Sequence, residues 1–319
     1  MQINQKKYFI TGGTGSFGRN FIKHIIKLKE TKKVVVFSRD ELKQLELRTE
    51  LKKFEKKLRF LIGDVRDKDR VKEGISDCNT VIHAAALKQV DTCEYNPIES
   101  IKTNIDGTCN VAKASIEQGV KKCLLISTDK AVNPINLYGS CKLAAEKVFI
   151  SSNYIKGKMP TIFSVVRYGN VSYSRGSVLK VYQELIKNGS NSLPITDKKM
   201  TRFAIDLNDA IKFVFKCLNL MKGNEIFIPK LNSYKITDLV KSLGKKNKII
   251  GIRPGEKLNE TLISQEELSQ CKEFKNFFII SNIFKNSKIS KKYNSGYTSN
   301  LPNNFLSIRD IKKNILKNV

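Results

Sequence analysis

The stretch TGGTGSFG, residues 11–18, directly follows the apolar run Tyr8–Ile10 and precedes an amphipathic segment near residues 17–29. Three of its four glycines, Gly12, Gly15 and Gly18, recur at every third position. Glycine lets the chain turn tightly and approach a pyrophosphate, whose charge then meets the N-terminus of the following helix. The stretch therefore predicts a dinucleotide-binding loop between a strand and a helix. The residues expected to contact the cofactor there are Gly12, Thr14, Gly15, Ser16, Phe17 and Gly18.

Short apolar runs alternate with helical patterns from this loop to about residue 170. The runs are YFIT, VVVF, RFLIG, TVIHAA, CLLIST and IFSVVRY, and the longer helices are expected near residues 41–54, 97–118 and 137–152. Six strands with helices between them predict an α/β fold with a parallel, doubly wound Rossmann sheet. Ligands of such a sheet bind at the carboxyl ends of its strands.

The rhythm breaks after residue 170, where loop-like stretches surround one helix near residues 179–187. The run EIFIP near residue 225 is a further candidate strand. We expect a dinucleotide-binding domain over residues 1–170 with a return near 203–230, and a smaller substrate-binding lobe over 171–202 and 231–285. Residues 286–319 are polar and basic, which predicts a loosely packed tail.

The end of the second strand bears on the choice of cofactor. An acidic residue there binds the ribose 2′-hydroxyl of NAD, whereas a basic residue accepts the 2′-phosphate of NADP. Ser38, Arg39 and nearby Lys43 favour NADP, and Asp40 keeps NAD open as the alternative.

Residues after the next two strands are assigned to the same cofactor site. Asp64 and Val65 follow the third strand, where they are placed to meet the adenine, and Ala84 follows the fourth. An ordinary turn is the alternative for Asp64 and Val65.

The fifth strand ends in Thr128-Asp129-Lys130, and Tyr138 and Lys142 follow on a helix. Residues four positions apart share a helix face. A phenol titrates near pH 10, so Tyr138 needs its anion stabilised to act as a base. A lysine at about 4 Å, with an effective dielectric constant of about 20, contributes roughly 4 kcal/mol before desolvation is subtracted. The alternatives are a surface Tyr–Lys pair and a plain Asp–Lys ion pair.

At these residues the chain resembles the extended short-chain dehydrogenase/reductase family, whose signature is the glycine loop with YxxxK. Hexose 4,6-dehydratases of that family place Thr-Asp-Glu where this chain has Thr-Asp-Lys. The resemblance is therefore closer to the inverting UDP-N-acetylglucosamine 4,6-dehydratases, and it runs from about Tyr8 to Ile280. The motifs that carry it are TGGTGSFG, SRDELKQ, GDVRD, HAAALK, EYNP, STDKAVNPINLYG, RYGNV, SRGSV, MTRF, EIFIPK and GIRPGEKL.

The resemblance implies a mechanism. Tyr138 takes the O4 proton while a hydride leaves C4, Lys130 removes the C5 proton, and Asp129 protonates the departing C6 hydroxyl. Hydride return to C6 then makes the enzyme a lyase with no net use of cofactor. Lys130 must be partly neutral, which burial or the charge of Lys142 is expected to favour, and Asp129 must be protonated.

The resemblance also implies a set of residues around the nucleotide sugar, and two or three arginines suit its diphosphate. The alternatives are structural ion pairs and a solvated lysine. The expected residues are Lys88, Asn170, Arg175, Thr201, Arg202, Arg253 and Glu256. Asp91, Ser172-Tyr173 and Asn259 depart from the family's usual residues, which leaves the sugar and its stereochemistry more open than the reaction type.

Two rival enzymes remain. A membrane-anchored, C5-retaining dehydratase usually carries methionine where this chain has Tyr138, together with an added N-terminal membrane region. A nucleotide-sugar 4-epimerase needs only Tyr138, Lys142 and the cofactor, and the Asp129–Lys130 pair argues against it.

Composition limits the other classes of protein. The net charge of +28 is spread over nearly the whole chain, so it favours compositional bias over a nucleic-acid site. Seven scattered cysteines and two histidines predict neither a disulfide framework nor a metal site. No apolar run is long enough for a membrane span, and the first strand begins too early for a signal peptide, so we expect a cytoplasmic protein. The resemblance implies a homo-oligomer such as a hexamer.

Overall fold

The computed structural model describes residues 5–172, 176–284 and 289–316. The chain divides into two compact units. The first comprises Met1–Ser127, Cys141–Val166 and Ile211–Ile226, and the second comprises Thr128–Ser140, Arg167–Ala210 and Phe227–Val319.

The first unit is built on six parallel strands in the order β3-β2-β1-β4-β5-β6. This order matches two βαβαβ halves that meet between β1 and β4, so the predicted doubly wound sheet is confirmed. The strands are β1 (Lys6–Thr11), β2 (Thr31–Ser38), β3 (Leu58–Ile62), β4 (Thr80–His83), β5 (Lys122–Thr128) and β6 (Ile162–Tyr168). β9 (Ile226–Pro229) neighbours β6, as the run EIFIP suggested.

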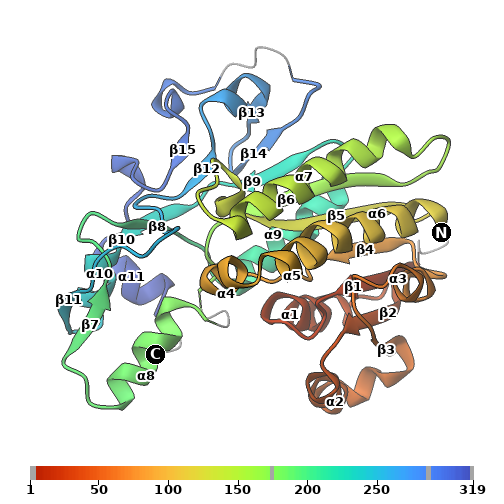
Figure 1. The fold of residues 1–319 in the computed structure, drawn as a ribbon, viewed down its shortest axis with the longest axis horizontal. Helices are drawn as coiled ribbons and strands as arrows, with labels where there is room; N and C mark the ends of the chain where they lie inside the picture. Colours follow the sequence, from red (N-terminus) through yellow and green to blue (C-terminus); the bar gives the residue numbers. More distant parts are fainter. Residues whose placement is uncertain (1–4, 173–175, 285–288, 317–319) are drawn as a thin grey trace. The chain divides into compact units, whose positions relative to one another are not determined.

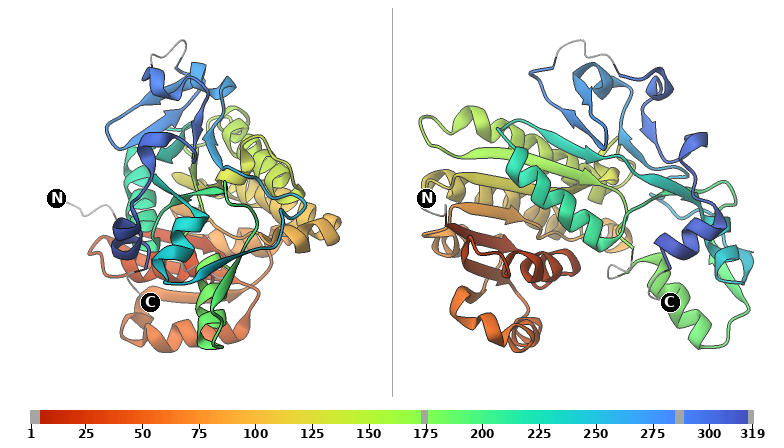
Figure 2. Two further views of the ribbon diagram at one scale, coloured as in Figure 1. Left: turned by 90° about the vertical axis from the view of Figure 1, so that its left-hand side faces the viewer. Right: turned by 180° about the vertical axis from the view of Figure 1, so that it is seen from behind.

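Helices cover both faces of this sheet. Figure 1 shows α6 and α7 in front of β4, β5 and β6, and the rear view of Figure 2 shows α9 on the opposite face. The ring of His24 on α1 lies 5.7 Å from that of Phe215 on α9. The helices are α1 (Ser16–Ile25), α2 (Glu41–Glu50), α3 (Lys68–Ile75), α4 (Val90–Tyr95), α5 (Pro97–Ile101), α6 (Gly107–Glu117), α7 (Leu137–Ile155) and α9 (Leu207–Leu220).

The predicted helix over residues 97–118 is interrupted by a π-helical turn at Lys102–Asp106. Within that turn, Asn104 exchanges two side-chain hydrogen bonds with the backbone of Leu87, at 2.8 and 2.9 Å. The turn therefore fixes the loop that follows β4. The helix predicted to reach residue 54 ends earlier, at Glu50, and a 3₁₀ segment, Lys52–Lys57, follows it.

The second unit is made of short elements. Its strands are β7 (Ser192–Ile195), β8 (Thr201–Ala204), β10 (Asn232–Lys235), β11 (Lys246–Ile249), β12 (Thr261–Ile263), β13 (Cys271–Glu273), β14 (Phe277–Ile280) and β15 (Tyr297–Thr298). Its helices are α8 (Val178–Lys187), α10 (Ile236–Ser242) and α11 (Ile308–Asn314). Pairing joins β8 to β10, β7 to β11 and β12 to β15.

The structure differs from the prediction of a loosely packed tail. β15 pairs with β12, and Tyr293, Tyr297 and Ile311 are buried. Tyr297 also donates a hydrogen bond to the carbonyl of Leu231, at 2.8 Å. A few large apolar side chains anchor a segment whose composition is otherwise polar, because each buries a large area.

Candidate functional site

The glycine loop between β1 and α1 makes a tight turn that packs closely against the segment after β4. Gly12 has φ +64°, and a Cβ there would lie 2.9 Å from the backbone of Ala84 and Ala85. The Gly15 N–H donates to the Gly12 carbonyl at 2.9 Å, and the first turn of α1, beginning at Ser16, carries no acidic side chain. A tight turn followed by a helix N-terminus fits a dinucleotide pyrophosphate.

Residues around the loop hold it in place. The Thr11 hydroxyl accepts from the Ala84 and Ala85 N–H groups at 3.1 Å and contacts Nδ1 of His83 at 2.7 Å. Burial and the charge of Lys142 lower the pKa of His83 to about 3, so His83 is a neutral structural residue. Thr14 is buried, and Phe17 stacks on Phe21 within α1.

The end of β2 is arranged around the start of α2. Asp40 accepts from the Lys43 N–H at 3.0 Å as the N-cap, and its carboxylate pairs with the Lys43 ammonium. The Ser38 hydroxyl accepts from the Gln44 amide at 3.1 Å. Arg39 remains half-exposed, at 3.6 Å from Asp64. Asp40 thus has a structural role in capping α2.

Asp64 has charged partners of its own. Its carboxylate accepts from the backbone and guanidinium of Arg66, and although burial raises the pKa of Asp64, these bonds hold it below its usual value. Val65 is buried, and a Cβ added at Gly107 would collide with it.

Lys142 lies on α7, one turn beyond Tyr138. Its ammonium donates to the Ile126 carbonyl at 2.8 Å. Burial lowers the pKa of Lys142 to about 8, and the charge of Glu146 partly offsets this effect. Glu146 is itself buried and accepts from the Ser127 hydroxyl at 2.5 Å. Tyr138 is 9% exposed.

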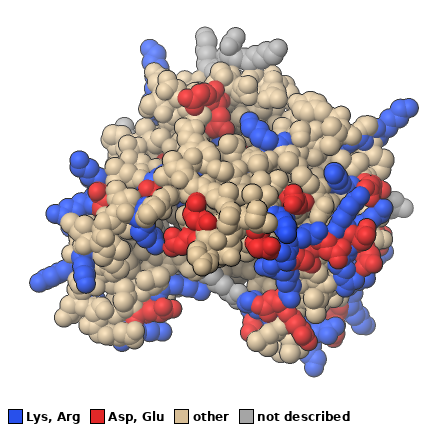
Figure 3. Space-filling model, viewed as in Figure 1, with Lys and Arg blue, Asp and Glu red and all other residues tan. Residues whose placement is uncertain are grey.

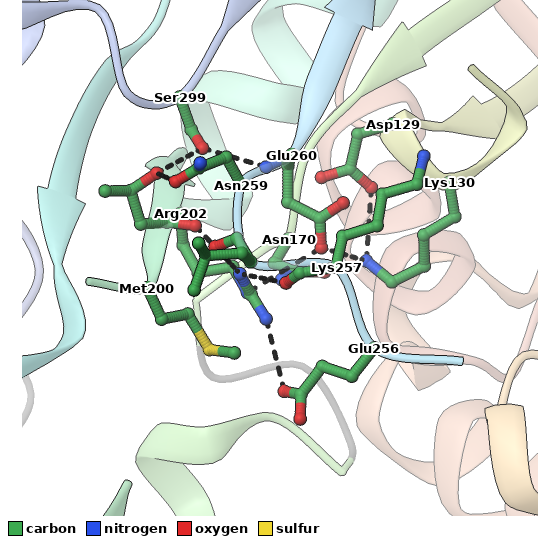
Figure 4. A network of polar contacts seen from close by, with 12 residues as sticks. Asp129, Lys130, Asn170, Met200, Arg202, Glu256, Lys257, Asn259, Glu260 and Ser299 are labelled. Atoms are coloured by element: carbon green, nitrogen blue, oxygen red, sulfur yellow. Dashed lines mark hydrogen bonds and ion pairs between the residues drawn. The ribbon is translucent and has the colours of Figure 1, made fainter. Parts of the chain in front are cut away.

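The second unit gathers several predicted residues into one polar network, drawn in Figure 4. Asp129 is fully buried at the end of β5 and accepts from the Thr128 hydroxyl at 2.9 Å. The Lys130 ammonium contacts Asp129 at 3.2 Å and the Asn170 amide oxygen at 3.0 Å. Asp129, Lys130 and Asn170 therefore meet, although residue 170 is distant from the other two in sequence.

The charges in this network give Lys130 a protonation state that differs from the predicted one. Burial opposes the Lys130 cation, but Asp129 and Glu260 outweigh burial and raise the pKa of Lys130 above its usual value. Burial and the charge of Glu260 raise the pKa of Asp129. Lys130 is therefore held as an ammonium, contrary to the expectation that burial or Lys142 would keep it partly neutral, whereas Asp129 is shifted in the expected direction.

Arg202, on β8, joins the same network. Its guanidinium pairs with Glu256 at 3.2 Å and lies 3.6 Å from Glu260. Glu256 also contacts Arg253, whose side chain is 61% exposed. The Arg202 cation thus already has two carboxylate partners within the protein, whereas the exposed guanidinium of Arg253 can still contact a ligand.

Sequence reasoning missed Glu260 and Ser299. Glu260 is 2% exposed and contacts the Lys130 ammonium at 3.2 Å. The Ser299 hydroxyl accepts from the Glu260 N–H at 2.9 Å and contacts the Thr201 hydroxyl at 2.6 Å. A signal for Glu260 existed, because it continues the motif GIRPGEKL, whereas Ser299 lies in the segment expected to be loosely packed.

Of the remaining predicted residues, Asn259 joins this network, and others lie outside the described residues. Arg175 and Tyr173 belong to the undescribed segment 173–175. Lys88 is exposed in the loop after β4. Asn259, one of the departures, accepts from the Thr201 hydroxyl at 2.7 Å.

Over the described residues, no helix combines the length and apolarity that crossing a bilayer requires. No group of three or more His, Cys, Asp or Glu side chains suited to a metal ion occurs in that same part of the chain.

Comparisons with known proteins place the chain among nucleotide-sugar enzymes. Residues 8–282 match the family described as "Polysaccharide biosynthesis protein". An inverting UDP-N-acetylglucosamine 4,6-dehydratase of Campylobacter jejuni is 50% identical over 281 residues, which are 88% of this chain and 84% of that protein. A UDP-glucose 4-epimerase of Rickettsia bellii is 41% identical over 284 residues, 86% of this chain and 82% of that protein. The crystal structure of Pen from Bacillus thuringiensis superposes with a TM-score of 0.90 at 38% identity, over 99% of both chains.

Proposed function

Because this chain belongs to the polysaccharide biosynthesis protein family, we propose that it is a UDP-N-acetylglucosamine 4,6-dehydratase that inverts C5. The observation that carries the proposal is the buried contact between Asp129 and Lys130, 3.2 Å apart at the end of β5. A 4,6-dehydration needs an acid for the C6 hydroxyl and a base for the C5 proton, and this pair offers both.

A nicotinamide cofactor, held by the residues of the glycine loop, would supply the hydride acceptor for C4 and the hydride donor for C6. Tyr138 accepts the O4 proton as C4 becomes a ketone, and cationic Lys142 favours the phenolate. Lys130 then removes the C5 proton, which the ketone has acidified. The C6–O bond breaks as Asp129 delivers a proton to the hydroxyl, and water leaves. A proton from solvent water reaches C5 on the opposite face, which inverts the sugar there.

Lys130 needs a lone pair before it can act as a base. Moving one proton from its ammonium to the Asp129 carboxylate, which it contacts at 3.2 Å, produces a neutral amine and a protonated acid together. Both reactive forms then arise from one internal proton transfer. The raised pKa of Asp129, caused by burial and Glu260, favours this direction of transfer, whereas the raised pKa of Lys130 opposes it.

We propose NADP as the cofactor, with the residues of the glycine loop, Ala84 and Lys142 among its contacts. Half-exposed Arg39 supports a 2′-phosphate, and the role of Asp40 in capping α2 removes the main argument for NAD. Lys43, paired with Asp40, and Asp64, paired with Arg66, reach the cofactor in this proposal only if those pairs rearrange. Measuring the affinities for NADP and NAD in Arg39→Ala tests the assignment, since only NADP should bind more weakly.

A UDP-sugar 4-epimerase is the second candidate, favoured by the 41% identity to the Rickettsia protein. Incubation with UDP-N-acetylglucosamine in heavy water, followed by NMR of the product, separates the two. The proposal requires a 4-keto-6-deoxy sugar with deuterium at an inverted C5. UDP-N-acetylgalactosamine as sole product would establish the epimerase, and an unexchanged C5 would exclude the elimination step.

The downstream product and the assembly state belong to the same proposal. If the sugar is inverted, it suits biosynthesis of a nonulosonic acid such as pseudaminic acid. We propose a homo-oligomer, such as a hexamer, that works in the cytoplasm. Sedimentation analysis of the purified protein tests the assembly state, and a monomer over the working range of concentration would contradict it.

A further inference from the structure

Glu260, immediately before β12, is a buried carboxylate for which the proposed reaction has no role. Its Oε1 atom contacts the Lys130 ammonium at 3.2 Å and lies 3.6 Å from Nε of Arg202. Its own N–H donates to the Ser299 hydroxyl, and the Ser299 N–H donates to its carbonyl at 2.8 Å. The backbone on both sides of the side chain is thus fixed, which is a requirement for a group that positions another.

Two carboxylates share one ammonium in this network, as Figure 4 shows. Asp129, Glu260 and the amide oxygen of Asn170 occupy the three donors that a lysine possesses. Oδ2 of Asp129 and Oε2 of Glu260 are buried without a hydrogen-bond partner among the described residues. Because a buried unpaired carboxylate oxygen is costly, the network favours protonation of one of the two acids.

Their surroundings decide which acid takes the proton. Glu260 has a second cation, Arg202, at 3.6 Å, whereas Asp129 has the neutral Thr128 hydroxyl in addition to Lys130, and the charge of Lys257 acts on both acids. Burial and Glu260 raise the pKa of Asp129; burial opposes ionisation of Glu260, but Lys130 and Arg202 lower its pKa overall. When the pKa values of two neighbouring acids are shifted in opposite directions, the two acids take different chemical roles. The titratable groups around the pair are Lys130, Arg202, Lys257, Tyr138 and Tyr234.

We propose that Glu260 is a positioning residue that stays ionised between Lys130 and Arg202 and so makes Asp129 the carboxyl group that carries the proton. The assignment rests on the proposed function for its catalytic meaning. In that reaction, Glu260 orients the ammonium of Lys130 and prevents Asp129 from remaining an ionised partner of it. Glu260 itself does not touch the reacting atoms.

The pH profile of kcat/KM for dehydration tests this role in Glu260→Gln. Without the charge of Glu260, Asp129 and Lys130 both lose their protons more readily. Both limbs of the profile should then move to lower pH, by about one unit or more. Glu260→Asp keeps the charge, so its profile should keep the wild-type position at a reduced rate.

Glu267→Gln is the matched control. Glu267 is another glutamate of the second unit that pairs with a buried arginine, Arg167, at 2.9 Å, and it has no contact with Lys130. This variant should lose stability without moving the profile. A Glu260→Gln enzyme that is slower but has limbs at the wild-type positions would overturn the proposal, because a purely structural residue behaves in that way.

A titration without substrate provides an independent measurement. As the pH of the wild-type protein is lowered, infrared difference spectra should show a buried protonated carboxyl first at Asp129, so that band should be absent from Asp129→Asn. If the band persists in Asp129→Asn, Glu260 carries the proton and the proposal is wrong. This result does not depend on turnover, so a protein that fails to dehydrate UDP-N-acetylglucosamine refutes the proposed function alone.

Discussion

Asp129 is the residue whose substitution should separate the two halves of the proposed reaction. In Asp129→Asn the side chain keeps its size but cannot supply a proton, whereas Tyr138 and Lys142 are unchanged. Oxidation at C4 should continue while elimination slows by about 10²–10⁴-fold, the usual contribution of a general acid. Absorbance of reduced nicotinamide should therefore build up in the presence of UDP-N-acetylglucosamine.

Tyr138→Phe is the companion variant for that experiment. The O4 proton then has no acceptor, so neither reduced nicotinamide nor dehydrated sugar should form. Dehydration at the wild-type rate in Asp129→Asn would remove Asp129 from the reaction.

Lys142 illustrates how a buried charge trades stability for function. Its pKa is lowered by burial to about 8, so between about pH 8 and the normal lysine value the unfolded chain binds the proton more readily. Burying the Lys142 cation therefore lowers the free energy of unfolding by its full amount below pH 8, and by less as the pH rises. Lys142→Met should be inactive yet more stable than wild type at pH 7, by about 1–3 kcal/mol once the lost bond to Ile126 is included.

Urea unfolding at pH 7 and at pH 9.5 checks this prediction, because the difference between variant and wild type should narrow at the higher pH. Lys147→Met is the control. It lies on the same helix but is exposed, so its effect should be small and equal at both pH values. A difference for Lys142→Met that is unchanged between the two pH values would contradict the account.

The sequence identified several residues of the polar network but could not predict their charge states. Asp129 and Lys130 were recognisable because they follow a buried strand within a family motif, and Arg202 lies in another such motif. The protonation of Lys130 depends on Glu260, which is 130 residues away along the chain. Such a charge effect appears only when folding brings the groups within a few ångströms, so sequence spacing could not reveal it.

At the level of elements, the segment containing β15 is the one whose packing its polar composition predicted wrongly. Lysine, asparagine and serine make up most of residues 285–300, but the buried rings of Tyr293 and Tyr297 pack against Phe278, with centroids 5.1 and 5.2 Å from it. The βαβ elements, by contrast, were predictable because their apolar periodicity is long and regular. A strand of two residues offers no periodicity, so its pairing with β12 depends on tertiary contacts.

Ser299 should connect this segment to catalysis. In Ser299→Ala, the buried Thr201 hydroxyl and Glu260 N–H lose their shared partner, which should cost about 1–3 kcal/mol of stability. Because Glu260 is then held less firmly, kcat for dehydration should also fall. Thermal unfolding and steady-state kinetics measure the two effects.

Ser307→Ala is a matched control in the same stretch of chain. Ser307 caps α11 by accepting from the Asp310 N–H at 3.1 Å, so its loss should cost about 1 kcal/mol of stability. It has no bond to Glu260 or Thr201, so kcat should be preserved. Equal losses of kcat in both variants would mean that the segment affects activity through stability alone.

At the level of the whole molecule, the net charge of +28 needs an interpretation that agrees with a sugar-nucleotide enzyme. Figure 3 shows Lys and Arg interspersed with Asp and Glu over the face in view, without a continuous basic stripe. Many of these charges are paired locally; Arg19, for example, contacts Glu46 and Glu50. Surface charges farther apart than about 8 Å are largely screened at physiological ionic strength.

A gel-shift titration with duplex DNA should therefore show binding at low salt that weakens steeply as salt is added. At physiological salt we expect a Kd no tighter than about 1 μM, the range of non-specific electrostatic binding. A sugar-nucleotide substrate should not compete with the DNA, because scattered charges and a built site bind independently. Submicromolar binding at physiological salt, displaced by UDP-N-acetylglucosamine, would instead show that the basic surface and the proposed site act together on nucleic acid.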